Sequence, residues 1–331
     1  MDVPVKDARR SGQLRYVIDD ASKVGEDRRT TQTLTTFEFD DDHAGKVAIA
    51  ATELANNLHL HAGGGELLIQ VLGAGDSRCL ELLSIDRGPG MADIARCLTD
   101  GYSTAGTPGT GLGAVKRLAN AFDIHSEPGQ GTIVMARFGP GSALRHGAIS
   151  IPLAGELDCG DSWYIVADGE GTAVLLVDGL GHGTFAAEAA QTCVDAFLRA
   201  PGDTPAQILQ RANLLMSKTR GGAAACARLQ GSSLTYAGVG NISGYLVSAE
   251  KSQGLMSHNG TLGMHRRPMQ QLDYKIATGA MLVMHSDGLS ARWNLKQHPA
   301  LLQSHPAIIA AVLYRDHARE RDDATVVVVA T

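Results

Sequence analysis

Glycine- and aspartate-rich turns, set beside short apolar runs, are the feature that most constrains this chain. In the first half they are Asp86-Arg87-Gly88-Pro89-Gly90 and Gly109-Thr110-Gly111-Leu112-Gly113. In the second half they are Asp178-Gly179-Leu180-Gly181-His182-Gly183 and Ser286-Asp287-Gly288. Glycine lets a backbone turn sharply or approach a ligand closely, and aspartate favours turns. The pattern predicts two separate sites, one in each half of the chain.

The length and one composition break predict the domain organisation. A chain of 331 residues is comfortable for two domains. The stretch Gly139-Pro140-Gly141-Ser142 is the clearest break in composition. We therefore expect a flexible N-terminus at residues 1–12, a first domain at 13–139, a linker at 140–152 and a second domain at 153–331.

The first half predicts an α+β domain with a largely antiparallel sheet, because its helices and strands are mixed without strict alternation. The helix expected at 43–61 has an apolar stripe and follows three aspartates, which complement a helix dipole. A helix at 20–33 is weakly patterned. The other expected elements are a helix at 112–122 and strands at 15–18, 66–71, 79–86, 123–125 and 132–138.

Strands dominate the second half. Many strands with paired helices predict two packed sheets flanked by helices. The expected helices cover 184–199 and 204–219. The expected strands cover 163–167, 173–177, 224–229, 234–239, 244–247, 280–285 and 325–330.

Charge and cysteine content exclude several classes of protein. The net charge of −6 argues against nucleic acid as a partner. None of the five cysteines forms a Cys-x-x-Cys pair, so we expect neither a disulfide framework nor a thiolate zinc site. The N-terminal segment lacks the apolar core of a signal peptide, and no apolar run is long enough to cross a bilayer. We expect a cytoplasmic protein without a membrane partner.

The helix at 43–61 carries polar residues suited to a metal-bound triphosphate. Glu53, Asn57 and His61 lie at i, i+4 and i+8, on one face of a regular helix. An amide oxygen is a hard ligand for Mg²⁺, and a glutamate can deprotonate an attacking hydroxyl. Polar residues on a solvated helix face are the alternative explanation. Asp86, after an apolar strand, can accept a hydrogen bond from the exocyclic amine of a base.

Residues 106–113 are glycine-rich and lead directly into a predicted helix. Free backbone N–H groups at a helix start, together with the helix dipole, favour phosphate. We expect Gly109, Gly111 and Gly113 to line this loop, and Lys116 to add positive charge one turn later. No Gly-Lys-Ser/Thr follows, so the segment is not a Walker loop. A flexible loop with a glycine cap remains the alternative.

Carboxylates at strand ends in the second half predict a metal site. Asp178 and Asp287 each follow an apolar strand, Asp322 precedes another, and Asp161 is a candidate fourth ligand. Hard oxygen ligands suit Mg²⁺ or Mn²⁺. Hydrolysis of a phosphate ester by two metal ions needs several carboxylates that converge on both ions. Each aspartate taken alone is more often a turn or cap residue than a metal ligand.

In order and spacing, the first-half motifs resemble the GHKL ATPases and kinases. Residues 51–138 resemble the anti-sigma-factor serine kinases and the stressosome switch kinases in particular. The resemblance rests on Glu53-Leu54-x-x-Asn57, Asp100-Gly101-Tyr102-Ser103-Thr104, Gly111-Leu112-Gly113 and Gly131-Thr132. It implies a GHKL (Bergerat) α/β sandwich that binds ATP and Mg²⁺. The implied roles are Mg²⁺ binding by Asn57, base by Glu53, adenine contact by Asp86 with support from Thr132, and pocket shaping by Gly88, Gly90, Gly111 and Gly113.

The second-half motifs resemble the PPM (PP2C-like) phosphatases of the SpoIIE type over residues 153–331. This resemblance implies an αββα sandwich with two Mn²⁺ or Mg²⁺ ions. Asp178 would bridge both ions, the Gly179 carbonyl would bind one, Asp287 and Asp322 would complete the pair, and Asp161 would act directly or through water. His182 would support the loop or the substrate phosphate rather than bind metal. The role of Asp323, at a position commonly occupied by Asn in eukaryotic relatives, stays open.

The two resemblances together imply a bifunctional bacterial signalling regulator. Its first domain would phosphorylate a Ser or Thr of a STAS-type antagonist or scaffold protein, and its second domain would hydrolyse phosphoserine or phosphothreonine. One alternative is a phosphatase gated by a nucleotide-sensing first domain that transfers no phosphate. Another is a partner-switching module that sequesters a sigma factor or another downstream regulator. A homodimer is also left open.

Overall fold

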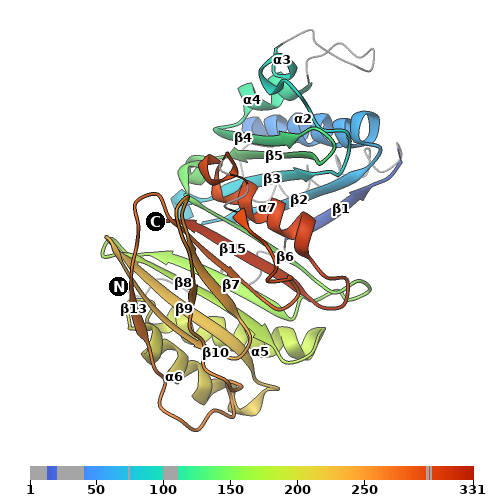
Figure 1. Ribbon diagram of the computed structural model, residues 1–331. Coiled ribbons are helices and arrows are strands. Elements are labelled where there is room, and N and C mark those ends of the chain that lie inside the picture. The colour runs from blue at the N-terminus through green and yellow to red at the C-terminus, as the bar shows by residue number, and fades with distance from the viewer. Residues whose placement is uncertain (1–12, 21–40, 74, 100–110, 296–297, 299) are drawn as a thin grey trace. The chain divides into compact units, whose positions relative to one another are not determined.

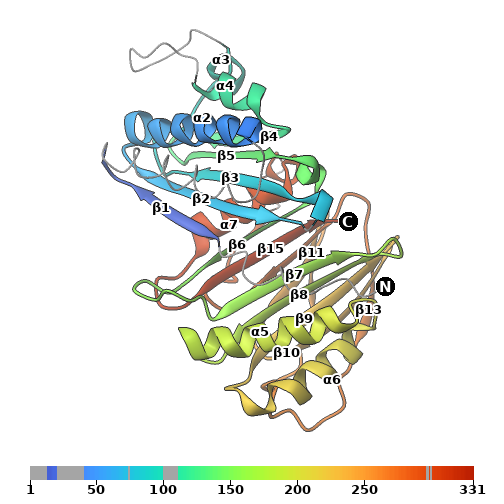
Figure 2. The ribbon, with the colours of Figure 1, turned by 180° about the vertical axis from the view of Figure 1, so that it is seen from behind.

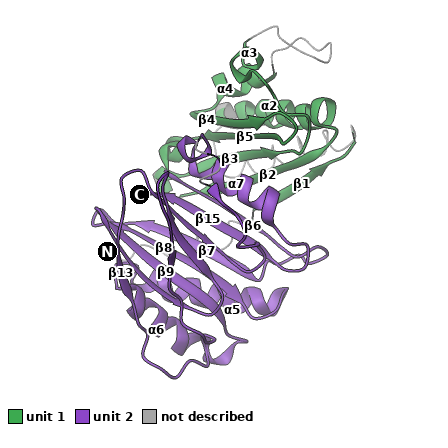
Figure 3. Ribbon diagram, in the orientation of Figure 1, with its two compact units in different colours: residues 1–144 green, residues 145–331 purple. Residues whose placement is uncertain are grey.

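The computed structural model describes residues 13–20, 41–73, 75–99, 111–295, 298 and 300–331. The chain forms two compact units, residues 1–144 and 145–331 (Figure 3). The helix expected at 20–33 and the N-terminal segment 1–12 lie outside the described residues, apart from Asp20. Of the helices in the described ranges, none is long and apolar enough to span a membrane.

Unit 1 is a five-stranded antiparallel sheet covered by helices on one face, in the order β1-β2-β3-β5-β4 (Figure 1). This confirms the α+β class and the antiparallel sheet. Its strands are β1 (Leu14–Ile18), β2 (Gly65–Leu72), β3 (Cys79–Ile85), β4 (Ala121–Glu127) and β5 (Gly131–Phe138). Its helices are α2 (Asp41–Asn57), α3 (Ile94–Cys97) and α4 (Gly111–Leu118).

The core of unit 1 lies between α2 and the sheet. Val47, Ala51 and Leu54 recur at helical spacing and are fully buried. They belong to one cluster with Leu67 of β2 and Leu82 of β3. The apolar stripe seen in the sequence is therefore the face by which α2 packs on the sheet.

Helix α4 is shorter than the segment predicted as helix at 112–122. It ends at Leu118, and Phe122 belongs to β4. The backbone N–H of Asn120 donates to the Arg137 carbonyl at 2.8 Å, and the Asn120 side chain accepts from the Gly139 N–H at 2.9 Å. These bonds to β5 and its end draw the chain out of the helix and into the sheet.

Unit 2 contains two five-stranded sheets, ordered β13-β10-β9-β8-β7 and β12-β11-β14-β15-β6, and all pairings between these strands are antiparallel. The first sheet contains β7 (Asp161–Ala167), β8 (Thr172–Gly179), β9 (Gly222–Gln230), β10 (Ser233–Val239) and β13 (Leu272–Lys275). The second contains β6 (His146–Ile151), β11 (Ser243–Val247), β12 (Ser252–Leu255), β14 (Met281–His285) and β15 (Ala324–Ala330). The helices are α5 (Thr184–Arg199), α6 (Pro205–Leu215) and α7 (Pro306–His317).

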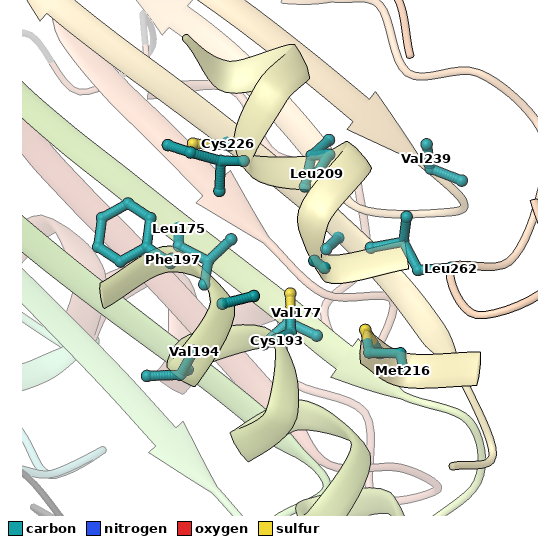
Figure 4. Close-up of a cluster of buried hydrophobic side chains, with 14 of the residues drawn as sticks. Leu175, Val177, Cys193, Val194, Phe197, Leu209, Met216, Cys226, Val239 and Leu262 are labelled. Atoms are coloured by element: carbon teal, nitrogen blue, oxygen red, sulfur yellow. The ribbon is translucent and has the colours of Figure 1, made fainter. Parts of the chain in front are cut away.

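These elements form a helix–sheet–sheet–helix sandwich, as the resemblance implies. Leu176 of β8 and Val327 of β15 belong to one buried cluster between the sheets. Helices α5 and α6 cover the outer face of the first sheet (Figure 2), where Phe197 and Leu209 pack with Leu175 (Figure 4). Helix α7 packs against β6 and β15 of the second sheet.

Among the described α-helices and strands of unit 2, β6, β12, β13 and α7 have no counterpart among the elements predicted from the sequence. Strand β6 lies inside the segment 140–152 that was predicted as a linker, and it pairs with β15 along its whole length. Position 147 must be glycine, because a Cβ there would lie 2.1 Å from the Ala307 Cα of α7. A glycine inside a strand interrupts the alternation of apolar and polar residues by which a strand is predicted. Strands β12 and β13 are short and largely exposed, so they lack an apolar alternation.

Candidate functional site

In unit 1, the end of α2 supplies two of the predicted site residues. Glu53 and Asn57 lie one turn apart on α2. The next residues, Leu58–Ala62, form a π-helical turn that ends at Gly63, whose φ is 73°. A π turn holds more residues than an α turn, so His61 leaves the row that a regular helix predicts. The turn instead brings Ala62 against Gly88, where a Cβ would lie 2.7 Å from the Ala62 Cα.

The start of α4 lies against Glu53 and Asn57. A Cβ on Gly111 would lie 3.0 Å from Glu53 Oε2 and 3.6 Å from Asn57 Oδ1. Among the described residues, Asn57 Nδ2 is buried and has no hydrogen-bond partner. A buried amide left unpaired costs about 1–3 kcal/mol, so such a group needs an explanation. The orphaned amide, beside a glycine that leaves space, fits a pocket that holds a polar ligand such as Mg-ATP.

Asp86 is fixed by hydrogen bonds from the backbone. Its Oδ1 accepts hydrogen bonds from the backbone N–H groups of Gly88 at 2.8 Å and Thr132 at 3.0 Å. The Thr132 hydroxyl lies 2.9 Å from that of Ser126. Gly90 has a φ of 68°, and a Cβ there would lie 2.1 Å from the Glu127 carbonyl, so the loop requires glycine. The structure therefore brings Asp86, Gly88 and Thr132 together, and their contact with adenine stays a prediction.

For three residues predicted to bind phosphate, the described part of the chain does not show a position beside Glu53 and Asn57. Gly109 lies outside the described residues. Gly113 is buried within α4, in the interior of the packed helix. Lys116 is exposed in the last turn of α4, away from the helix start. The contact of Lys116 and Gly113 with a nucleotide stays a prediction.

In unit 2, the two aspartates on neighbouring strands face each other. Asp161 on β7 and Asp178 on β8 are direct cross-strand partners. Asp161 is buried, and its Oδ2 accepts a 2.6 Å hydrogen bond from the Ser286 hydroxyl. Ser286 also accepts from the Thr325 N–H at 3.1 Å, and so ties β15 to Asp161. Ser286 belongs to a motif noted in the sequence, but only the fold reveals its partner.

Asp178 lies among several carboxylates. Burial, followed by the negative charges of Asp287 and Asp322, raises the pKa of Asp178 to about 7. Asp178 also repels Asp161, whose pKa is raised well above its ordinary value chiefly by burial. The fold therefore places all four predicted ligands in one region of negative charge.

The carboxylates are held by neighbouring groups in this arrangement. Asn241 donates to Asp287 Oδ2 at 2.6 Å, and Asp322 Oδ1 accepts from the Asp323 N–H at 2.9 Å. Within the described ranges, no three His, Cys, Asp or Glu side chains are grouped so as to hold a metal ion. The donor set nevertheless consists of hard oxygen atoms, which fits Mg²⁺ or Mn²⁺ and disfavours softer metals.

Asp323, whose role the sequence left open, holds the backbone beside Asp161. The residue is buried, with only 2% of its surface exposed. Oδ1 accepts from the Leu153 N–H at 2.8 Å, and Oδ2 accepts from the Gly160 N–H at 2.9 Å. Gly160 in turn accepts from the Gly179 N–H at 3.0 Å. Asp323 thus fixes the chain before Asp161 and, through it, the loop after Asp178.

The loop after Asp178 has its own support. His182 Nδ1 lies 2.6 Å from Glu156 Oε1, and Thr184 Oγ1 donates to Asp158 Oδ2 at 2.9 Å. A Cβ on Gly183 would lie 2.7 Å from Glu156 Oε2, so the glycine allows this carboxylate to approach. The predicted loop-supporting position of His182 is consistent with these contacts, while the part played by Glu156 has no sequence signal.

Comparison with known proteins identifies both units. Residues 168–331 match the family model of stage II sporulation protein E (SpoIIE), and residues 19–138 match that of the histidine kinase-like ATPase domain. The serine/threonine-protein kinase RsbT of Bacillus subtilis (strain 168) is 38% identical over 91 residues, which are 28% of this chain and 68% of RsbT. The phosphoserine phosphatase RsbX of the same strain is 27% identical over 139 residues, 41% of this chain and 70% of RsbX.

Solved structures show the same fold as unit 2. A chain from a structure of the bacterial stressosome, "a modular system that has been adapted to control secondary messenger signaling", has a TM-score of 0.52 and 24% identity. The match covers 56% of this chain and 98% of that one. RsbX in complex with magnesium has a TM-score of 0.50 and 24% identity, over 55% of this chain and 92% of that one. The chain therefore belongs to the histidine kinase-like ATPase family in its N-terminal part and to the SpoIIE family of PP2C-type phosphatase domains in its C-terminal part.

Proposed function

We propose that this partner-switching regulator is bifunctional. Its N-terminal domain uses Mg-ATP to phosphorylate a Ser or Thr of a STAS-type protein, and its C-terminal domain removes phosphate from the same protein or from another in its pathway. The observation that carries the kinase half of the proposal is the position of Gly111, where a Cβ would lie 3.0 Å from Glu53 Oε2 and 3.6 Å from Asn57 Oδ1, since it joins two distant motifs around an orphaned amide. The names of the relatives RsbT and RsbX, a kinase and a phosphatase, support it.

In the kinase site, the residues of this chain would have separate roles. Asn57 would hold Mg²⁺, which supplies charge neutralisation for the phosphates when bound. Glu53 would accept the proton of the attacking hydroxyl. Asp86, held by the Gly88 and Thr132 N–H groups, would accept a hydrogen bond from the adenine amine.

In the phosphatase site, four carboxylates and one carbonyl would hold two Mg²⁺ or Mn²⁺ ions, which supply an activated water when bound. The proposed ligands are Asp161, Asp178, Gly179, Asp287 and Asp322. Ser286 and Asp323 would keep the site in shape through the hydrogen bonds described above. A cytoplasmic location and a STAS-domain partner belong to the same proposal, with a sigma factor or downstream regulator as a further partner.

The test uses Asp287→Asn, a variant in which the phosphorylated product should accumulate. The variant is mixed with Mg²⁺, γ-labelled ATP and a purified STAS-domain protein, and label on Ser or Thr is measured. Wild-type protein with Mn²⁺ should then remove that label. Addition of Glu53→Ala to Asp287→Asn should abolish labelling while ATP binding survives.

Each other outcome has a definite meaning. ATP binding without label on any STAS protein would replace the kinase with a nucleotide sensor that gates the phosphatase. A stable nucleotide-dependent complex with a sigma factor, without phosphotransfer, would favour sequestration. Protein that neither binds ATP nor removes phosphate contradicts the proposal as a whole.

A further inference from the structure

An exposed arginine, Arg220, lies beside the loop that follows Asp178. It lies two residues before β9, whose first residue, Gly222, pairs with Gly179 of β8. The Leu180 N–H donates to the carbonyl of Gly221 at 2.9 Å. The two segments therefore run together at the end of the sheet where the predicted metal ligands lie.

The guanidinium of Arg220 reaches over this loop. Its Nη1 lies 3.2 Å from the position that a Cβ on Gly181 would take, and the φ of Gly181 is 89°. Its Cζ lies 5.0 Å from the centre of the Phe185 ring. A residue larger than glycine at 181 would therefore crowd the guanidinium, and the ring holds it by a cation–π contact.

Arg220 has neither an ion pair nor a hydrogen bond among the described residues, unlike the nearby acidic side chains. Glu156 pairs with His182, and Asp158 accepts from Thr184. Phe185 is 62% exposed, so the ring is not there to fill a core. An ordinary surface arginine is mobile in solvent, whereas this one is stacked on a ring at the edge of a carboxylate-rich site.

A cation beside the carboxylates would help an anionic substrate to bind in the predicted site. A phosphate monoester is an anion, and Asp161, Asp178, Asp287 and Asp322 would repel it. Bound metal ions offset part of this repulsion, but a guanidinium adds a planar fork of donors that matches two phosphate oxygens. A stacked guanidinium also loses less freedom when it binds.

We propose that Arg220 receives the phosphate group of the substrate in unit 2, and that Phe185 is the positioning residue that holds its guanidinium. This inference rests on the proposed phosphatase function and adds a substrate-binding residue to it. The ligand class is a phosphate monoester dianion, and inorganic phosphate is its product.

The experiment compares Arg220→Ala and Arg220→Lys with the matched control Arg199→Ala. Arg199 is also an exposed arginine without a partner among the described residues, but it lies at the far end of α5 from Phe185. Binding of inorganic phosphate to the Mg²⁺-loaded full chain is measured by calorimetry. Hydrolysis of p-nitrophenyl phosphate is measured in parallel.

Arg220→Ala should weaken phosphate binding about tenfold to hundredfold, because hydrogen bonds between charged groups are lost. It should raise KM for the aryl phosphate by a similar factor. Arg220→Lys should bind phosphate more weakly than wild type but more tightly than Arg220→Ala. Arg199→Ala should match wild type in both phosphate binding and KM. Phe185→Ala should weaken phosphate binding less than Arg220→Ala does. Phe185→Tyr, which keeps an aromatic ring under the guanidinium, should bind phosphate as wild type does.

The outcomes separate this inference from the function on which it rests. Wild type that binds phosphate but hydrolyses no phosphate ester refutes the phosphatase, while loss of binding in Arg220→Ala still supports the role of Arg220. Equal phosphate binding by wild type and Arg220→Ala overturns the inference. Absence of phosphate binding by the Mg²⁺-loaded wild type also overturns it.

Discussion

Replacement of Asp323 tests whether this aspartate is structural. Its two carboxylate oxygens accept from the N–H groups of Leu153 and Gly160, at 2.8 and 2.9 Å. Asp323→Ala would leave both donors without a partner. Asp323→Asn keeps the shape but offers one oxygen, and its NH₂ group would face the second donor.

The expected loss of stability follows from these two bonds. An unsatisfied donor costs about 1–3 kcal/mol, so two give about 2–6 kcal/mol. Burial raises the pKa of Asp323, so the charged native side chain itself carries a desolvation cost, which its removal relieves. We therefore expect Asp323→Ala to lower the free energy of unfolding by about 2–4 kcal/mol, and Asp323→Asn to lower it by about half as much. For a unit of this size, the alanine variant should lower Tm by about 4–16 °C.

Tryptophan fluorescence reports this unit selectively. The two tryptophans of the chain, Trp163 and Trp293, both lie in unit 2. Urea titrations should be followed by their emission, with EDTA present so that metal binding does not enter the comparison. The neighbouring Asp322→Asn is the control, since asparagine keeps an oxygen that can accept from the Asp323 N–H and removes only the charge of a predicted ligand. Alanine and asparagine variants of Asp323 that both stay within about 0.5 kcal/mol of wild type would refute the reasoning.

Two further predictions concern the candidate sites. Gly111→Ala places a Cβ 3.0 Å from Glu53 Oε2, so ATP-dependent labelling of the STAS protein should fall at least about tenfold, while the free energy of unfolding changes by no more than about 1 kcal/mol. The control is Gly45→Ala, because a Cβ at position 45 has nothing within 4 Å. Equal labelling by the two variants would contradict the proposed pocket. The pKa of Asp178 is raised to about 7, so its protonated form is favoured more in the native than in the unfolded state. Its contribution to stability is present at acid pH and is lost as pH rises through about 7. Urea titrations of metal-free protein should therefore show lower stability at pH 8 than at pH 5, Mg²⁺ should reduce the difference, and a flat profile in EDTA would contradict the assignment.

The sequence predicted those parts of the fold that carry a period or a motif. Helix α5 begins and ends at the predicted residues, because its apolar face repeats at helical spacing between a glycine-rich turn and a proline. Helix α7 was missed because it is apolar at every position from 307 to 313 and shows no periodic contrast. Strand β6 was missed because Gly147 interrupts its pattern where α7 comes close.

In the candidate sites, the residues within motifs could be predicted from the sequence, whereas the hydrogen bonds between distant segments could not. Asp161 and Asp178 could be named from their motifs, and the register of β7 and β8 then places them opposite each other. The bonds from Ser286 to Asp161 and from Asn241 to Asp287 join segments far apart in the chain. No local pattern encodes such pairs, because they depend on how the two sheets stack. The same holds for Arg220, whose importance comes from its neighbours in space.

The pairing of β6 with β15 has a consequence for synthesis. Strand β15 lies between β14 and β6, so the second sheet joins the first strand of unit 2 to residues 324–330. The sheet of unit 1, in contrast, has all its strands once Phe138 has emerged. At ~5–20 residues per second, roughly 10–40 s separate the two events on the ribosome. A nascent chain whose first unit folds on emergence would pass through an interval in which only the phosphate-adding half of the proposed switch is assembled.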